Sequence, residues 1–231
     1  MYVLDLDLDF FLDNVCPLAE KGARPDANQA SPWPEEQVRF FLEHNCGLRR
    51  ETPVPGALFE THDQALSHWQ RLDMPLSVTH VDAHSDLGIG KPGPAFVLES
   101  VITRPVETRL DIPGYYAQQQ LDEANYLLFA LAFRWISELE NVRNPASLPD
   151  MPSFCGEGFL QLESAVGQLI PALNRHEPKI PYRVYADWRT FRAKAPYAFA
   201  SLAVSPRYAP QTADALIPII GEYVDFSATT T

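Results

Sequence analysis

The first residues of the chain alternate between apolar and acidic side chains. In the stretch LDLDLDFF, every second position is large and apolar: Leu4, Leu6, Leu8 and Phe10. The positions between them are the aspartates Asp5, Asp7 and Asp9. Strict alternation predicts a β-strand with one face in the core and one carboxylate face. Neighbours on that face lie roughly 6.5 to 7 Å apart, so the three charges repel each other unless they face water or a cation.

Two helices are predicted in the segments that follow. In SPWPEEQVRFFLEHNCG, Pro34 suits a first helical turn and Gly47 can close the helix in a left-handed conformation. In THDQALSHWQRL, Thr61 can cap a helix whose apolar positions recur at helical spacing. His62 then falls at the start of this helix. A Pro-rich connection joins the two segments.

The rest of the chain alternates between strand and helix patterns. MPLSVTHVDAHSDLGIGKPGP predicts a strand that runs through Val81 into a loop rich in Gly and Pro. Residues 121–139 are apolar on most sides, which predicts a deeply packed helix. YRVYADW and AFASLAVS predict two more strands, and TADALIPIIGEYV predicts a closing helix broken by Pro218. This order indicates an α/β fold with a mainly parallel sheet flanked by helices, in a single domain over residues 1–231.

Composition and charge narrow the functional classes. Hydrophobic residues make up 46% of the chain and charged residues 21%, which is globular composition. No apolar run is long enough to span a bilayer and no leader precedes the first strand, so we expect a cytoplasmic protein without a membrane partner. The net charge of −12 argues against nucleic acid as a partner and suits a cationic ligand or simple solubility. Cys16, Cys46 and Cys155 lack metal-site spacing and are expected to be buried thiols.

The clearest chemistry lies where the strand through Val81 ends. The motif HVDAHSD places His80, Asp82, His84 and Asp86 at every second position. In extended backbone, these four side chains would project to one side and aim at the same volume. Burying two carboxylates without compensation costs several kcal/mol each, so the motif indicates a bound cation.

A metal centre also accounts for the acidic face of the first strand. If that face lies beside the end of the HVDAHSD strand, the repulsion among its aspartates becomes coordination of one or two divalent ions. Five or more oxygen donors with two or three nitrogens favour manganese or magnesium over zinc. We expect two Mn²⁺ ions, which would activate a water molecule as a nucleophile near neutral pH.

These motifs resemble those of a known family. DAHSD is similar to the Asp-Ala-His-x-Asp motif of the arginase (ureohydrolase) superfamily, and DLDLDFF is similar to its Asp-x-Asp motif. In arginases the Asp-x-Asp motif follows the other motif, whereas here it opens the chain. This order, with HVDAHSDL and ANYLLFALA, resembles a divergent branch that includes peptide arginases. The resemblance implies a three-layer arginase/deacetylase-like fold and a binuclear manganese site.

The resemblance implies a role for each matching residue after the second strand. Asp82 would bridge both ions, Asp86 would bind the first ion, and His84 would bind the second. Asp82 and His84 would thereby also be catalytic. The superfamily uses a further histidine near a helix start, which is His62 or its competitor His80.

The N-terminal strand would supply the remaining ligands. The resemblance implies that Asp7 bridges the two ions and that Asp9 binds the second ion. Asp5 and Asp7 form the alternative pair if the register is shifted by two residues.

Substrate binding and proton transfer rest on weaker assignments. Asn125 in ANYLLFALA matches the first residue of the family's catalytic Asn-x-His-Gly pattern, but Leu stands in the place of His. A carboxylate that binds no metal should hold a guanidinium by paired hydrogen bonds, and Glu157 in CGEG and Glu99 are candidates. The segment SPRYAP, around Ser205 and Tyr208, is either a substrate-side loop or a simple turn.

The function implied by the resemblance is hydrolysis of arginine side chains within a ribosomally made precursor peptide, giving ornithine and urea. Free arginine or agmatine is an alternative substrate. Two other classes remain open: a zinc deacetylase or amidohydrolase with one metal, and a non-catalytic protein whose acidic cleft binds basic peptides. The oligomeric state is left open.

Overall fold

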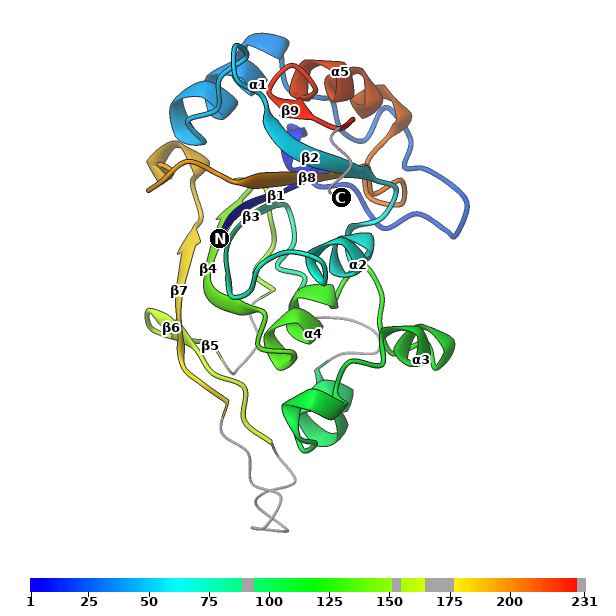
Figure 1. Ribbon diagram of the computed structural model, residues 1–231. Helices are drawn as coiled ribbons and strands as arrows, with labels where there is room; N and C mark the ends of the chain where they lie inside the picture. The colour runs from blue at the N-terminus through cyan, green and yellow to red at the C-terminus, as the bar shows by residue number, and fades with distance from the viewer. Residues whose placement is uncertain (89–93, 151–154, 165–176, 228–231) are drawn as a thin grey trace.

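The computed structural model describes residues 1–88, 94–150, 155–164 and 177–227. Part of the Gly- and Pro-rich loop expected after Asp86 therefore lies outside the described residues. In the described part, one sheet contains nine strands in the order β5-β6-β7-β4-β3-β1-β8-β2-β9 (Figure 1). The strands are β1 Tyr2–Asp7, β2 Val54–Phe59, β3 Leu76–Asp82, β4 Ile136–Arg143, β5 Cys155–Gly156, β6 Phe159–Leu160, β7 Ile180–Tyr185, β8 Phe199–Ala203 and β9 Val224–Asp225.

The helices are short. The α-helices are α1 Glu35–Phe40, α2 Ala65–Trp69, α3 Ile112–Ala117, α4 Tyr126–Ala132 and α5 Ile217–Ile220. Turns of 3-10 helix cover Leu8–Phe11, His62–Gln64, Val106–Thr108, Trp188–Thr190 and Gln211–Leu216, and π-helical turns cover Phe41–Asn45 and Val97–Val101.

The prediction of a mainly parallel sheet is confirmed. β1 lies in the middle of the sheet and pairs in parallel with β3 on one side and β8 on the other. Among the described strands, only the β5/β6 and β6/β7 pairs are antiparallel. Parallel strands end at a common edge, so the carboxyl ends of β1 and β3 lie side by side.

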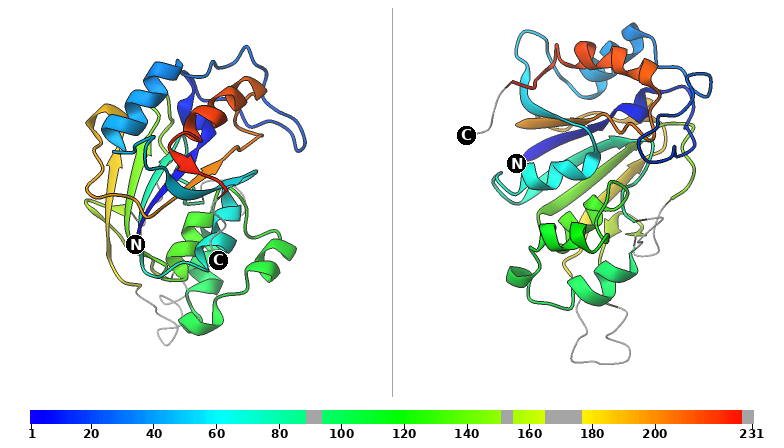
Figure 2. Two further views of the ribbon diagram at one scale, coloured as in Figure 1. Left: turned by 45° about the horizontal axis from the view of Figure 1, so that its top comes forward. Right: turned by 90° about the vertical axis from the view of Figure 1, so that its right-hand side faces the viewer.

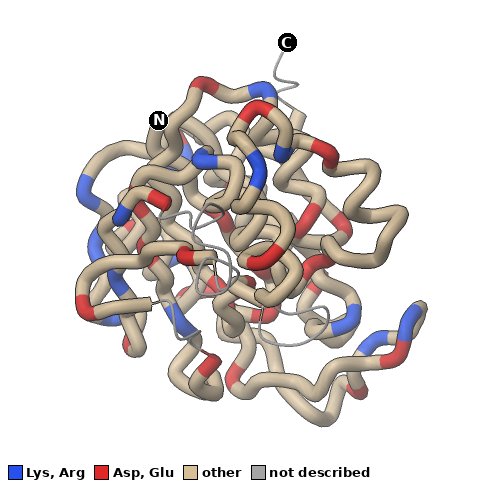
Figure 3. Tube along the Cα trace, turned by 90° about the horizontal axis from the view of Figure 1, so that it is seen from below, with Lys and Arg blue, Asp and Glu red and all other residues tan. Residues whose placement is uncertain are grey.

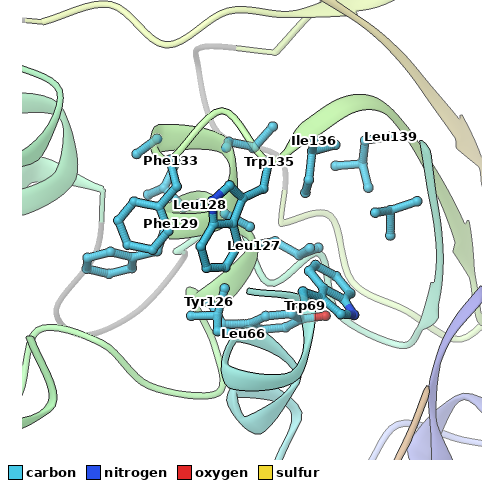
Figure 4. Close-up of a cluster of buried hydrophobic side chains, with 14 of the residues drawn as sticks. Leu66, Trp69, Tyr126, Leu127, Leu128, Phe129, Phe133, Trp135, Ile136 and Leu139 are labelled. Carbon is cyan, nitrogen blue, oxygen red and sulfur yellow. The ribbon is translucent and has the colours of Figure 1, made fainter. Parts of the chain in front are cut away.

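Helices cover both faces of the sheet, which gives three layers (Figures 1 and 2). On one face, α2 and α4 pack against Val3 and Val78 of the central strands. Figure 4 shows Leu66 and Trp69 of α2 beside Tyr126 of α4 in this core. On the other face, α1 and α5 pack against Leu4 and Leu6 of β1. Successive side chains of β1 therefore enter different cores, and Asp5 and Asp7 share the face of Val3 with α2 and α4.

The prediction of one helix over residues 121–139 is wrong at its C-terminal end. α4 ends at Ala132, Arg134 has a left-handed φ of 61°, and β4 begins at Ile136. A continuous apolar run does not distinguish a buried helix from a buried strand. The left-handed residue turns the chain, so that a helix and a central strand occupy the predicted segment.

Other boundaries also differ from the sequence prediction. β1 ends at Asp7, and Asp9 lies on the 3-10 turn Leu8–Phe11 rather than on the strand. The segment taken as a Pro-rich connection contains β2. Pro218 lies in the first turn of α5, where its missing N–H costs no helical hydrogen bond, instead of breaking a longer helix.

The positions of Gly47, Cys16 and Cys46 agree with the sequence prediction, whereas Cys155 is less buried than expected. Gly47 has a φ of 69° after the helical segment that ends at Asn45. Cys16 and Cys46 are buried free thiols, and Cys155 is half-buried. Basic positions are scattered along the trace seen in Figure 3 instead of forming one continuous face. Within the described residues, no helix has the length and apolarity needed to cross a membrane.

Candidate metal centre

The acidic ends of β1 and β3 meet at the carboxyl edge of the sheet, as the sequence predicts. The parallel register places Asp5 beside His80 and Leu6 beside Val81, so the residues that follow both strands leave the sheet at the same place. His and Asp side chains from these segments, together with His62 from the turn before α2, form two groups that could each hold a metal ion.

The first group consists of His62, His80, Asp82 and Asp86, all of them buried. His62 Nδ1 lies 3.1 Å from Asp82 Oδ2 and 3.3 Å from Asp86 Oδ2. His80 Nε2 lies 3.4 Å from Asp82 Oδ2. The structure therefore brings together both histidines that the sequence analysis treated as competitors.

The second group consists of Asp9, Asp82 and His84. His84 Nδ1 lies 3.0 Å from Asp9 Oδ2 and 3.4 Å from Asp82 Oδ1. Asp82 belongs to both groups: its Oδ2 atom faces the first and its Oδ1 atom faces the second. Two adjacent donor sets joined by one carboxylate have the composition expected of a binuclear centre.

Short turns, rather than one extended strand, aim these side chains. β3 ends at Asp82, and Asp86 has a left-handed φ of 51° that turns its carboxylate back toward the histidines. Asp9 Oδ1 accepts a hydrogen bond of 3.3 Å from the backbone N–H of Ala83, which ties the two motifs together. The expectation that HVDAHSD projects four side chains from extended backbone is thus wrong, although the four still converge.

Asp7 lies beside the two groups but is not a member of either. Its Oδ1 atom accepts a hydrogen bond of 3.0 Å from the backbone N–H of Asp9, and its Oδ2 atom accepts one from the hydroxyl of Ser205. Asp7 Oδ2 also lies 3.1 Å from His62 Nδ1. Asp7 therefore caps the turn that carries Asp9, and the carboxylate that belongs to both groups is that of Asp82; bridging by Asp7 stays a prediction.

The carboxylates of the centre are too crowded to ionise independently. Burial raises the pKa of Asp86 to about 7, and the charge of Asp82 adds to this effect. Burial and the charges of Asp7 and Asp82 raise the pKa of Asp9 well above its usual value. For Asp82, burial acts in the same direction but is outweighed by the hydrogen bonds from His62 and His84, which lower its pKa.

The histidines respond to the same negative charge. Burial alone would lower the pKa of His84, but the charges of Asp9 and Asp82 outweigh it and raise that pKa to about 12. His80 Nε2 is buried and has no hydrogen-bond partner among the described residues, although it faces two carboxylates. A divalent cation would offset the clustered carboxylates and use this open nitrogen, so the donors fit a metal ion.

Three residues support the centre: Tyr126 and Ser201, which sequence reasoning missed, and Ser205, which it assigned to a substrate-side loop or a turn. The hydroxyl of Tyr126 donates a hydrogen bond to Asp5, and its ring stacks on that of His62 at a centroid distance of 4.8 Å. Ser201 donates to Asp5 and Ser205 donates to Asp7. Nothing in the local pattern of either serine indicates this, because each lies about 200 residues away from its aspartate along the chain.

Asn125, which was expected to be catalytic, has a structural position. Its Oδ1 atom accepts a hydrogen bond of 3.0 Å from the backbone N–H of Asp122, and its Nδ2 atom donates one of 2.9 Å to the carbonyl of Gln120. Both ends of the amide thus hold the turn before α4. The neighbouring Tyr126, and not Asn125, reaches the centre.

The two carboxylates proposed to bind a guanidinium lie away from the centre. Glu157 is exposed on the turn between β5 and β6, and β6, β7 and β4 separate β5 from β3. At about 4.8 Å per strand, this spacing amounts to roughly 19 Å. Glu99 is exposed on the π-helical turn Val97–Val101 and belongs to neither group.

The segment SPRYAP does lie at the rim of the centre. The ring of Tyr208 contacts that of His84 at a centroid distance of 4.8 Å. Arg207 Nη1 donates a hydrogen bond of 3.1 Å to Glu123 Oε1, whose side chain is largely buried. Burial raises the pKa of Glu123, and the charges of neighbouring carboxylates, including Asp7, contribute in the same direction. Glu123 is thus a carboxylate beside the centre that already binds a guanidinium.

Asn141 is a further buried polar residue on this side of the sheet. It lies beside His80 in the β3/β4 register, and it is fully buried. Neither its Oδ1 atom nor its Nδ2 atom has a hydrogen-bond partner among the described residues. Burying an amide without hydrogen-bond partners lowers the stability of the folded state. A substitution at Asn141 can therefore test whether this amide destabilises the protein.

Comparisons with known proteins give no family to which the chain can be assigned. No protein-family model, no curated protein and no solved structure matches it.

Proposed function

We propose that this protein is a manganese-dependent hydrolase that converts arginine side chains of a peptide to ornithine and releases urea. The observation that carries the proposal is the pair of buried donor groups joined by Asp82. The arginase/deacetylase-like identity of the fold is part of the proposal, and the three-layer α/β architecture with the site at the carboxyl edge of a parallel sheet supports it.

The donor set supports two hard ions over one zinc ion. Four carboxylates and three imidazoles lie at the centre once Asp7 is counted with the two groups, and no described cysteine belongs to either group. Carboxylate-rich sites suit manganese, whereas zinc prefers His and Cys. When bound, the two ions would supply the Lewis acidity that activates water for attack on the guanidinium carbon.

The chain's own residues would perform the remaining tasks. Asp82 would hold both ions, with His80 and Asp86 on one side and Asp9 and His84 on the other. The buried negative charge around them favours approach of a cationic group. The Glu123 carboxylate would accept the N–H groups of the substrate guanidinium in place of Arg207.

A groove at the same edge of the sheet supports a peptide substrate over a free amino acid. The groove has a volume of about 600 Å³, and Leu12, Trp33, Asn144 and Trp188 are among the residues that line it. Leu12 follows the turn that carries Asp9, and Asn144 follows β4. Aromatic side chains in a groove are a common surface for extended peptides.

Mass spectrometry of arginine-containing peptides tests the proposal. In the presence of Mn²⁺, we expect a loss of about 42 Da per modified arginine, the change for conversion of a guanidine to an amine by metal-activated water. Asp82→Asn should abolish the reaction, and Asp73→Asn, an exposed aspartate before β3, should not change it.

The same assay separates the alternatives. Free arginine and an acetyl-lysine peptide with Zn²⁺ are the comparison substrates. If urea is released from free arginine but not from the peptides, the substrate is the free amino acid. If the acetyl-lysine peptide is deacetylated with one zinc ion bound per chain, the protein is a zinc deacetylase instead.

A further inference from the structure

Asp5 occupies the centre of a row of polar residues that crosses three strands. The register places it opposite His80 of β3 on one side and opposite Ser201 of β8 on the other. Registered neighbours in a parallel sheet point to the same face. The row therefore faces α2 and α4; His62 lies on the turn before α2, and Tyr126 is the first residue of α4.

Both carboxylate oxygens of Asp5 already have partners. Oδ1 accepts a hydrogen bond of 2.5 Å from Ser201 Oγ. Oδ2 accepts one of 3.2 Å from His80 Nδ1 and another from the hydroxyl of Tyr126, and His62 Nε2 lies 3.2 Å away from it. Asp5 is fully buried and belongs to neither donor group.

The position of Asp5 decides which nitrogen of each ring faces the centre. His80 presents Nδ1 to Asp5, which leaves its unpartnered Nε2 facing Asp82 and Asp86. His62 presents Nε2 to Asp5 and Nδ1 to the same two carboxylates. One carboxylate thus contacts the far nitrogen of both histidines in the first group.

We propose that Asp5 is a positioning residue that orients both His62 and His80 toward one metal ion, and that it is not itself a ligand. A ligating histidine commonly donates its second N–H to a carboxylate, which fixes the tautomer and the ring orientation. Here His80 Nδ1 donates to Asp5 and His62 Nε2 lies 3.2 Å from the same carboxylate, while Ser201 and Tyr126 hold the aspartate in place. The inference rests on the metal centre of the proposed function and does not depend on the substrate.

Metal binding to Asp5→Asn tests the inference directly. Removing a carboxylate that orients a ligating histidine typically weakens metal affinity by about 10- to 100-fold. We expect this loss for one of two Mn²⁺ ions in titration calorimetry, while the ion held by Asp9 and His84 keeps its affinity. At saturating Mn²⁺, the variant should still bind two ions. Asp73→Asn is the matched control and should bind Mn²⁺ like the unmodified protein.

A spectroscopic readout separates positioning from ligation. Pulsed electron paramagnetic resonance of bound Mn²⁺ detects the nitrogen couplings of ligating imidazoles. In Asp5→Asn these couplings should change, because the rings lose their fixed orientation. With both ions bound at saturating Mn²⁺, unchanged nitrogen couplings would overturn the inference, since the rings would then keep their orientation without Asp5. Loss of one ion at saturating Mn²⁺ would overturn it as well, since Asp5 would then act as a ligand.

Milder variants keep the inference testable if Asp5→Asn does not fold. Ser201→Ala and Tyr126→Phe each remove one hydrogen bond to Asp5. Each should lower the affinity for the same Mn²⁺ ion by up to about tenfold. Unchanged affinity in both folded variants would contradict the inference. Absence of Mn²⁺ binding in the unmodified protein would contradict both the metal centre and this inference. Mn²⁺ binding without arginine hydrolysis would contradict only the proposed reaction.

Discussion

Arg207 Nη1 lies 3.1 Å from Glu123 Oε1, at the rim of the metal centre. The substrate guanidinium of the proposed reaction would compete with Arg207 for this carboxylate. We expect Glu123→Gln to weaken binding of an arginine-containing peptide by about tenfold or more, because one charge-assisted hydrogen bond is worth about 1.5 to 3 kcal/mol. Arg207→Gln should instead tighten binding. Fluorescence anisotropy of a labelled peptide measures both affinities.

Arg50 provides the control for the Arg207 variant. Its side chain is 52% exposed, it pairs with Glu43 at 3.5 Å, and it lines neither the centre nor the proposed peptide groove. Arg50→Gln should leave peptide affinity unchanged. Equal affinity in Glu123→Gln and in the unmodified protein would show that Glu123 is not part of the peptide site.

Metal removal should destabilise the protein. Without cations, the carboxylates of Asp9, Asp82 and Asp86 lie close together in a buried site. An ion present at 100 times its dissociation constant stabilises the folded state by about 2.7 kcal/mol. For a chain of this size, this corresponds to a rise in Tm of roughly 5 to 10 °C. Differential scanning calorimetry with EDTA and with added Mn²⁺ measures the shift.

The same measurement has an internal control. Asp82→Asn removes the carboxylate that both groups share, so its Tm should respond little to EDTA or Mn²⁺. A full shift in this variant would place the stabilising ion elsewhere in the protein.

Asn141→Leu should stabilise the metal-free protein. The side chains are similar in volume, and the substitution removes a buried amide whose two polar atoms lack partners among the described residues. Burying an unsatisfied polar group costs about 1 to 3 kcal/mol, so we expect a gain of about 1 kcal/mol in urea unfolding. A loss of stability would show that the amide has hydrogen-bond partners, such as bound water.

Glu177 should make the free energy of unfolding depend on pH in the acidic range. Burial tends to raise its pKa, but hydrogen bonds from Arg109 and Arg134 outweigh burial and lower the pKa below its usual 4.5. The pairs therefore contribute their full stability above pH 4.5, and this contribution is lost as the pH falls through the lowered pKa. The free energy of urea unfolding, measured from pH 7 to pH 3, should fall over this range.

Glu177→Gln isolates this contribution. Arg109 and Glu177 are both buried, and breaking a buried ion pair from one side costs about 3 to 5 kcal/mol. The variant should be less stable at pH 7 and should show a smaller fall toward pH 3. Arg134→Gln should cost less, because the Arg134 side chain is 46% exposed. Parallel pH profiles for Glu177→Gln and the unmodified protein would contradict this assignment.

Local patterns predicted the central strands better than their neighbours. Alternation around Asp5 and the run that ends at Val81 each identified a real strand. The pattern failed for β2, where Pro55 and Gly56 obscure a strand, and for β4, whose apolar residues continue those of α4. In both cases the neighbouring strands decide the structure, because pairing with them overrides weak or ambiguous local preference.

The sequence also predicted only part of the candidate centre. The residue types and spacing of HVDAHSD identified Asp82, His84 and Asp86, which the structure places in the two groups. The hydrogen-bond partners of Asp5 and Asp7 could not be predicted, because they are Ser201 within β8 and Ser205 beyond it, far away along the chain. Glu123 was missed because its proximity to the centre follows from the packing of the turn before α4.

The sequence by itself determined which side chains this protein can bring to a metal ion, and that they lie at the ends of buried parallel strands. Alternation and spacing are local properties, so they are visible in a single segment. Only the tertiary structure decided which atom of each side chain faces the centre. Strand register and the turns after the strands set those directions, and both depend on contacts between segments as far as 198 residues apart.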